Sequence, residues 1–139
     1  MISVELAGAL KMAGLVWHPT SGDRFALVTG AFDDEIFTLS DMVVQAQESR
    51  TGTVLGFNGT TEWALDSAEA TDALWLPRED QLRALLGSSF GSLERSDEGY
   101  RVLAMLPGQQ QDEPSAYWGA EPAEAYGRAL LALIGRALG

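Results

Sequence analysis

Residues 53–65 read Thr-Val-Leu-Gly-Phe-Asn-Gly-Thr-Thr-Glu-Trp-Ala-Leu, and this stretch carries the clearest local structural signal in the chain. Asn58-Gly59 fits a type I′ turn, because both central residues of that turn need a positive φ and Asn and Gly adopt it at low cost. After the turn, larger apolar side chains alternate with polar or small ones, as in a half-buried strand. The stretch therefore predicts a β-hairpin with strands at 53–57 and 60–65.

Further short strands are expected along the chain. A second hairpin is predicted from the segments 93–95 and 100–106, which flank the polar turn Ser96-Asp97-Glu98-Gly99. A strand at the edge of the sheet is predicted at 115–119, after a polar loop. The remaining predicted strands are 15–18, 24–28, 35–39 and 42–47.

Three segments have the apolar periodicity of amphipathic helices. The first is expected to begin after the N-cap Ser3 and to stop at Gly14. The second has Pro77 at its first helical position, a stripe of leucines and a stop at Gly87. The last begins at Pro122, and its apolar residues recur at i, i+4, i+7, i+8 and i+11: Tyr126, Leu130, Leu133, Ile134 and Ala137.

These strands and helices predict an α+β fold, with an antiparallel sheet of about six strands and three main helices packed on it. The length of 139 residues fits one domain over residues 1–139, and 46% hydrophobic residues suffice for a core. No apolar stretch approaches the ~18 residues needed to span a bilayer, and no secretory signal pattern opens the chain. Arginine makes up all but one of the nine basic residues, a bias typical of GC-rich bacterial genomes. We therefore expect a bacterial, cytoplasmic protein.

The chain is strongly acidic, with 20 Asp and Glu against 9 Lys and Arg and a net charge of −11. Nucleic-acid binding needs clustered Lys and Arg to neutralise phosphates, so the charge argues against a nucleic-acid partner. The absence of cysteine excludes disulfides, thiolate metal sites and cysteine nucleophiles. A partner with a basic surface is the class that this charge favours.

No catalytic, cofactor-binding or metal-binding residues are predicted. The single histidine, His18, precedes Ser21 and Asp23, but these three lie in one short turn without a nucleophile elbow. A zinc site would also need further His or Cys ligands. A histidine in a surface loop is the favoured interpretation.

Two groups of acidic residues are interpreted as solvated surface. The first lacks the ligand spacing of a calcium-binding loop. The second lacks the cleft and defined carboxylate separation that glycoside hydrolysis needs. The first group is Asp33, Asp34, Glu35 and Asp41, and the second is Asp66, Glu69 and Asp72.

The four tryptophans are Trp17, Trp63, Trp75 and Trp118. Most are expected in the core, because aromatic rings bury a large area. Tryptophan is also enriched in binding hot spots, and Trp75 and Trp118 are the candidates for an interface.

The segments Gly56-Phe57-Asn58-Gly59-Thr60-Thr61-Glu62-Trp63-Ala64-Leu65-Asp66-Ser67 and Leu74-Trp75-Leu76-Pro77-Arg78-Glu79-Asp80-Gln81-Leu82 resemble a family of small, uncharacterised bacterial proteins. Some members of that family are labelled pilus assembly proteins. The similarity extends over most of the chain, and it implies no catalytic residues. The ATPases of pilus assembly need a glycine-rich phosphate loop with its lysine, whereas no such loop precedes Lys11.

The sequence thus predicts a non-enzymatic protein-interaction module of an adaptor, regulatory or immunity-like kind. Asp33, Asp34 and Glu35 are expected to contact the basic partner, together with Trp75 and Trp118. The alternative is a small-ligand binder or a carboxylate-based hydrolase, with a cleft lined by Trp63 and by acids of raised pKa. A third hypothesis is a nucleic-acid mimic, whose carboxylates would be spaced like phosphates.

Overall fold

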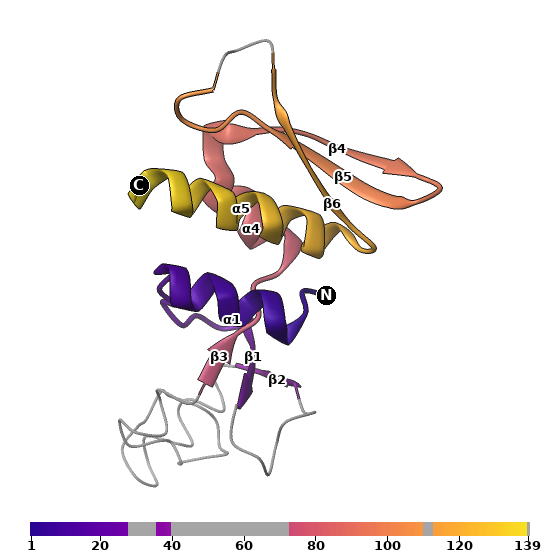
Figure 1. The fold of residues 1–139 in the computed structure, drawn as a ribbon. Helices are drawn as coiled ribbons and strands as arrows, with labels where there is room; N and C mark the ends of the chain where they lie inside the picture. Colours follow the sequence, from indigo (N-terminus) through magenta and orange to yellow (C-terminus); the bar gives the residue numbers. More distant parts are fainter. Residues whose placement is uncertain (28–35, 40–72, 110–112, 139) are drawn as a thin grey trace, which may run out of the picture. The chain divides into compact units, whose positions relative to one another are not determined.

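A computed structural model describes residues 1–27, 36–39, 73–109 and 113–138 (Figure 1). The fold is α+β, as predicted, and the described strands pair antiparallel throughout. The elements in chain order are α1 (Val4–Ala13), β1 (Arg24–Leu27), β2 (Ile36–Thr38), β3 (Ala73–Trp75), α4 (Glu79–Leu86), a 3₁₀ turn η2 (Gly87–Ser89), β4 (Phe90–Ser96), β5 (Gly99–Ala104), β6 (Ser115–Gly119) and α5 (Pro122–Leu138).

The six described strands form two three-stranded sheets, with the orders β2-β1-β3 and β4-β5-β6. The chain groups into two compact units. We call Met1–Val16 with Pro77–Gly139 the helical unit and Trp17–Leu76 the aromatic unit. The single domain expected over 1–139 stays a prediction.

Helix α1 begins and ends where local rules place it. The Ser3 hydroxyl accepts a hydrogen bond from the Leu6 N–H at 3.1 Å, which satisfies one of the free donors of the first turn. Gly14 has φ 118°, and its N–H caps the carbonyls of Leu10 and Lys11. The buried face of the helix carries Leu6, Ala7 and Leu10.

Helix α4 differs in detail from its prediction. Pro77 lies before the N-cap Arg78 rather than in the first turn, and the Gln81 side chain accepts the Arg78 N–H at 2.9 Å. The stripe of leucines is narrower than expected, because Leu82 is fully buried while Leu85 is 42% exposed. In an eight-residue helix that buries only one side, the i, i+4 pair Leu82 and Leu86 faces the core.

The predicted second hairpin is confirmed as β4 and β5, joined at Ser96–Gly99. Val102 and Ala104 are fully buried, and α5 packs against β5 and β6. Figure 1 shows α4 and α5 on the same side of the sheet β4-β5-β6. Strand β6 is the predicted edge strand, paired only with β5 among the described strands.

Helix α5 is the centre of the helical unit, with contacts to α1, α4, β5 and β6. Gly127 lets α1 approach closely, because a Cβ there would lie 2.7 Å from Leu6 Cδ2. Of the predicted apolar stripe, Tyr126 and Leu130 are buried. The later members Leu133 and Ile134 are half-buried and Ala137 is exposed, so burial decreases toward the C-terminus.

In the aromatic unit, the predicted strands at 24–28 and 35–39 are confirmed in their described parts as β1 and β2. The strand predicted at 15–18 is wrong, because these residues form no ladder and Trp17 is held by its side chain instead. Strand β3 was not predicted, since three residues are too short to show a period. It pairs with β1, in the register Phe25 opposite Trp75.

Several predictions lie outside the described residues. They are the hairpin at 53–65, the strand at 42–47, Trp63 and the acidic residues Asp33, Asp34, Glu35, Asp41, Asp66, Glu69 and Asp72. Among the helices in the described ranges, none combines the length and the apolar character that a bilayer span requires.

Candidate interaction surface

Three side chains of different chemistry lie in one row across the sheet of the helical unit. Glu94 of β4 is opposite Arg101 of β5, and Arg101 is opposite Trp118 of β6. Directly paired residues of an antiparallel sheet share a face, so the three side chains are on the same side. On β5, Arg101 is followed by Val102, which is fully buried, and successive side chains of a strand point to opposite faces of the sheet. The row therefore lies on the face away from the core. We call this side of β4-β5-β6 the open face.

The row is held together by the Arg101 guanidinium. Its Nε donates to Glu94 Oε1 at 2.9 Å, and its Nη2 donates to the same oxygen. Its central carbon lies 5.4 Å from the centre of the Trp118 ring. A cation over an indole ring at an exposed site contributes ~0.5–1 kcal/mol. Arg101 thus fixes a carboxylate on one side and an aromatic ring on the other.

Trp118 is 41% exposed although it belongs to a regular strand. Its backbone carbonyl accepts a hydrogen bond from Arg128 Nη1, which ties the edge strand β6 to α5. The surrounding backbone is therefore fixed while the ring stays accessible. The ring of Trp118, a predicted interface residue, is thus accessible to a partner. The contact of Trp118 with a partner stays a prediction.

A second row lies beside the first on the open face. Ser92 is opposite Leu103, and Leu103 is opposite Ala116. Ser92 and Leu103 are half-buried, and Ala116 is exposed. The open face thus combines a charged and aromatic row with a row of small and apolar side chains.

Trp75, the other predicted interface tryptophan, belongs to an aromatic cluster of the aromatic unit. Phe37, Phe25 and Trp75 are paired across β2, β1 and β3, and the Phe25 and Phe37 ring centres lie 5.4 Å apart. Trp17 lies 5.6 Å from Phe25 and 6.5 Å from Trp75, nearly parallel to the latter at 10°. The indole nitrogen of Trp75 is buried and has no hydrogen-bond partner among the described residues. Trp75 is therefore mainly a packing residue, whereas Trp118 is exposed.

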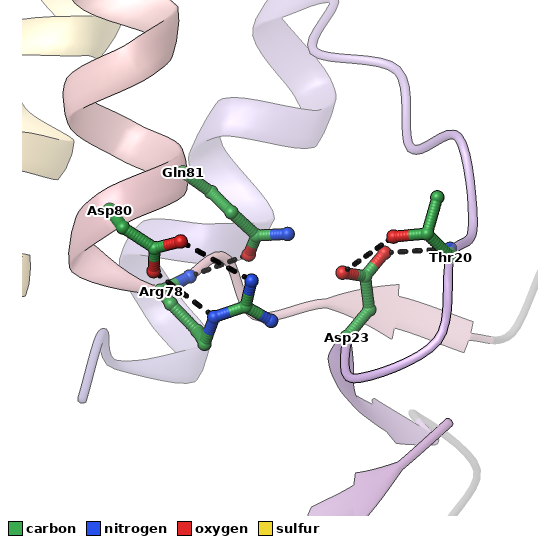
Figure 2. A network of polar contacts seen from close by, with 5 residues as sticks. All are labelled: Thr20, Asp23, Arg78, Asp80 and Gln81. Atoms are coloured by element: carbon green, nitrogen blue, oxygen red, sulfur yellow. Dashed lines mark hydrogen bonds and ion pairs between the residues drawn. The ribbon is translucent and has the colours of Figure 1, made fainter. Parts of the chain in front are cut away.

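Sequence reasoning missed the role of Asp23, which is 1% exposed. Its carboxylate accepts hydrogen bonds from Trp17 Nε1 at 2.8 Å, from the Thr20 N–H at 3.0 Å and from the Thr20 hydroxyl at 3.2 Å. Figure 2 shows the two contacts from Thr20. His18 and Ser21, the other members of the rejected triad, are exposed. A turn that contains Thr, Ser, Gly and Asp was a usable signal, because such side chains bond nearby backbone groups.

Among the described titratable groups of the helical unit, two have a shifted pKa. The Arg78 guanidinium donates to Asp80 from Nε at 3.1 Å and from Nη2 at 3.4 Å, and this hydrogen bonding lowers the pKa of the Asp80 carboxyl (Figure 2). Burial raises the pKa of the Tyr126 hydroxyl. The Tyr126 ring packs 5.7 Å from Phe90, over which the Arg83 guanidinium lies at 4.4 Å. The Arg78–Asp80 pair lies within the start of α4, whereas the second arrangement joins α5, β4 and α4.

Charge is distributed unequally between the units. The aromatic unit contains ten acidic residues and two arginines, a net charge of −8. The helical unit contains ten acidic and seven basic residues, a net charge of −3. The predicted contacts Asp33, Asp34 and Glu35 belong to the strongly acidic unit and lie outside the described residues.

Within the described ranges, no three His, Asp or Glu side chains gather in a group that could hold a metal ion. Comparison with known proteins gives no match to a family model, to a curated protein or to a solved structure.

Proposed function

We propose that the protein is a non-enzymatic protein-interaction module, of an adaptor, regulatory or immunity-like kind, that acts in the bacterial cytoplasm and binds a protein with a basic surface. The observation that carries this proposal is the net charge of −8 on the sixty residues Trp17–Leu76. A concentration of one sign of charge accelerates the encounter with an oppositely charged protein and suppresses self-association. The same charge disfavours nucleic acid as a partner.

The acidic run Asp33-Asp34-Glu35 is the proposed first point of encounter. In the sequence it directly precedes Ile36, the first residue of β2, and it is flanked by Phe32 and Phe37. Consecutive carboxylates repel one another, so folding stability gives no reason for their presence. Their effect should fade with salt, because the Debye length falls from about 10 Å at 0.1 M to about 3 Å at 1 M.

The test is a charge reversal in each unit. The protein is used to capture a partner from a bacterial extract at low and at high salt, and the purified partner is then bound to the wild type and to two triple variants. The triple variant Asp33→Lys, Asp34→Lys, Glu35→Lys is expected to slow association about tenfold at low salt. The matched control Glu5→Lys, Glu79→Lys, Glu113→Lys changes the total charge equally at exposed positions of the helical unit. It is expected to slow association much less.

Equal rates for both triple variants would show that only the total charge matters. An association rate that responds neither to reversal nor to salt would contradict the proposal.

A small-ligand binder is the second candidate, and one observation favours it. The buried Trp75 Nε1 has no acceptor in the part of the chain that the structure describes, and the parallel Trp17 ring lies 6.5 Å away. A flat ligand with a hydrogen-bond acceptor suits such a donor. A panel of aromatic heterocycles tested by thermal shift should then stabilise the wild type more than Trp75→Phe, which keeps a ring but loses the N–H. Equal shifts would exclude a role for this nitrogen.

A further inference from the structure

We propose that the open face of β4-β5-β6 docks a partner segment in which an arginine or lysine lies next to an apolar side chain. This inference rests on the proposed function, because it names the face and the chemistry by which the basic partner is held after encounter. It concerns the helical unit, whereas the acidic run belongs to the aromatic unit.

The geometry of the open face offers an acceptor and an aromatic surface in one row. Both contacts from Arg101 go to Glu94 Oε1, and in the described part of the chain Glu94 Oε2 has no hydrogen-bond partner. Adjacent strands are about 4.8 Å apart, so Glu94 and Trp118 are about 10 Å from each other across Arg101. A partner segment that crosses the strands can therefore place a cation at Glu94 and a second side chain on the indole.

The second row supplies the apolar part of the surface. Leu103 and Ala116 lie beside Arg101 and Trp118 on the open face, two residues along β5 and β6. Leu103 is half-buried and Ala116 is exposed, so both offer apolar surface to a side chain of the partner. The exposed Trp118 in contact with Arg101 has the composition of an interface hot spot, in which tryptophan and arginine are enriched.

The charges around the open face indicate the sign of the charge that the partner segment carries. Exposed Asp97 and Glu98 form the turn that follows Glu94, and no ion pair is found for either side chain in the described ranges. The nearby arginine of the open face, Arg101, is already neutralised by Glu94. Arg95 lies opposite Tyr100, on the other face of the sheet. On the open face itself the charges of Glu94 and Arg101 offset each other, and the adjoining turn adds the two unpaired carboxylates of Asp97 and Glu98, which suits a basic segment.

Arg128 does not add an unpaired positive charge to the open face. Its Nη1 donates to the Trp118 carbonyl, and its Nη2 lies 3.9 Å from Glu124 Oε1. A second copy of the chain is a poor occupant, because two open faces would bring the same carboxylates together at a net charge of −11 per chain. A basic partner segment is the occupant to which we commit.

The probe is a pair of short peptides of opposite charge, acetyl-Gly-Leu-Arg-Leu-Arg-Gly-amide and its counterpart with Glu at both Arg positions. Each is titrated into the full ¹⁵N-labelled chain, and amide and indole shifts are followed by NMR. The arginine peptide is expected to shift the amides of Glu94, Leu103, Ala116 and Trp118 and the Trp118 indole. The glutamate peptide is expected to leave them unchanged.

Variants on one face and on a distant helix sharpen the test. Ala116→Arg places a cation on the open face at an exposed strand position, and about tenfold weaker binding of the arginine peptide is expected. The matched control Met12→Arg adds the same charge to α1, where Met12 is 88% exposed, and less than a twofold change is expected. Trp118→Ala should also weaken binding about tenfold, and Trp118→Phe should restore most of it.

Each outcome separates this inference from the proposed function. Shifts confined to Trp17–Leu76 would overturn the docking assignment and leave the basic partner in place. No shift anywhere with the arginine peptide would contradict both. An equal loss of affinity for the arginine peptide in Ala116→Arg and Met12→Arg would show a general charge effect. It would overturn the assignment of the docking site to the open face. Open-face shifts that depend on protein concentration without peptide would point to a second copy and overturn it as well.

Discussion

The two units of the chain stabilise their interiors by different means. The helical unit buries aliphatic and small side chains, with Leu10, Leu82, Val102 and Ala104 fully or almost fully covered. The aromatic unit stacks rings around Phe25 and buries the Asp23 carboxylate beneath Trp17 and Thr20. The first arrangement depends on close contact and has little to do with charge. The second depends on a polar group that must keep its partners.

This difference bears on function. The helical unit has a net charge of −3, and the open face of its sheet carries an accessible Trp118. The aromatic unit carries most of the negative charge. Long-range charge affects how fast proteins meet, whereas desolvated aromatic contacts affect how long they remain bound. The division of residues between the units is consistent with a division of these tasks.

The largest expected effect is the loss of the buried carboxylate. Asp23→Ala should lower the free energy of unfolding by about 3 kcal/mol, because Trp17 Nε1 and the Thr20 N–H lose their acceptor. The exposed Asp97→Ala is the control and should change it by less than about 0.5 kcal/mol. Hydrogen exchange should show lost protection in Trp17–Leu76 with β5 unchanged. An equal loss of protection in β5 would contradict the inference that the two units are stabilised by different means.

Close packing in the helical unit is tested with two glycines. Gly119→Ala should destabilise by about 2 kcal/mol, because its Cβ would lie 2.5 Å from Glu124 Cβ and 2.7 Å from the Ala125 nitrogen. Gly8→Ala meets no atom within 4 Å and should stabilise α1 by about 0.5–1 kcal/mol. Denaturant midpoints measure both. If Gly119→Ala has no effect, the end of β6 is not packed as closely against α5 as the structure shows.

The same substitution in each unit compares the half-buried indole donor of Trp17 with the exposed ring of Trp118. Trp17→Phe should lower the free energy of unfolding by about 1.5 kcal/mol, because Asp23 loses a charge-assisted hydrogen bond. Trp118→Phe should cost less than about 0.5 kcal/mol, since the ring over Arg101 is kept. Chemical denaturation of the two variants gives the difference directly. Similar costs would mean that Trp118 contributes to the core, which would also weaken its assignment to an interface.

The smallest effect is expected in alkaline solution. Burial raises the pKa of Tyr126, so between its ordinary pKa near 10 and the raised value the folded chain keeps a proton that the unfolded chain has lost. Stability should therefore fall as the pH rises above about 10. Melting temperatures between pH 8 and 11 should fall less steeply for Tyr126→Phe than for wild type. The control Tyr117→Phe should follow the wild-type slope, and an identical slope for both variants would contradict the assignment.

Much of the local structure was predictable from the sequence. Helix α1 begins after Ser3 and ends at Gly14, α5 begins at Pro122, and the polar turn Ser96–Gly99 joins the strands β4 and β5 of a hairpin. These features depend on residues within a few positions of one another, where backbone conformation and capping decide the outcome. The same reasoning failed at 15–18 and missed β3, because short extended segments have no period and become strands only if a partner pairs with them.

The candidate site was predictable only in part. Trp118 was chosen by residue type, and neither Glu94 nor Arg101 was connected with it. Their row follows from the register of β4, β5 and β6, in which Arg101 and Trp118 are opposite each other although 17 positions apart. The burial of Asp23 likewise depends on the Trp17 indole, which approaches it only once the turn has formed.

The sequence by itself determined the α+β class, the negative charge, both ends of α1, the start of α5 and the hairpin turn Ser96–Gly99. These follow from composition and from interactions between near neighbours. Only the tertiary structure decided that the described strands divide into two sheets, that Trp118 is exposed while Trp75 packs in a cluster, and that Arg101 joins a carboxylate to an indole. The physical reason is that strand pairing and burial are non-local. They depend on which segments meet after loop closure, and no residue type or short pattern encodes that choice.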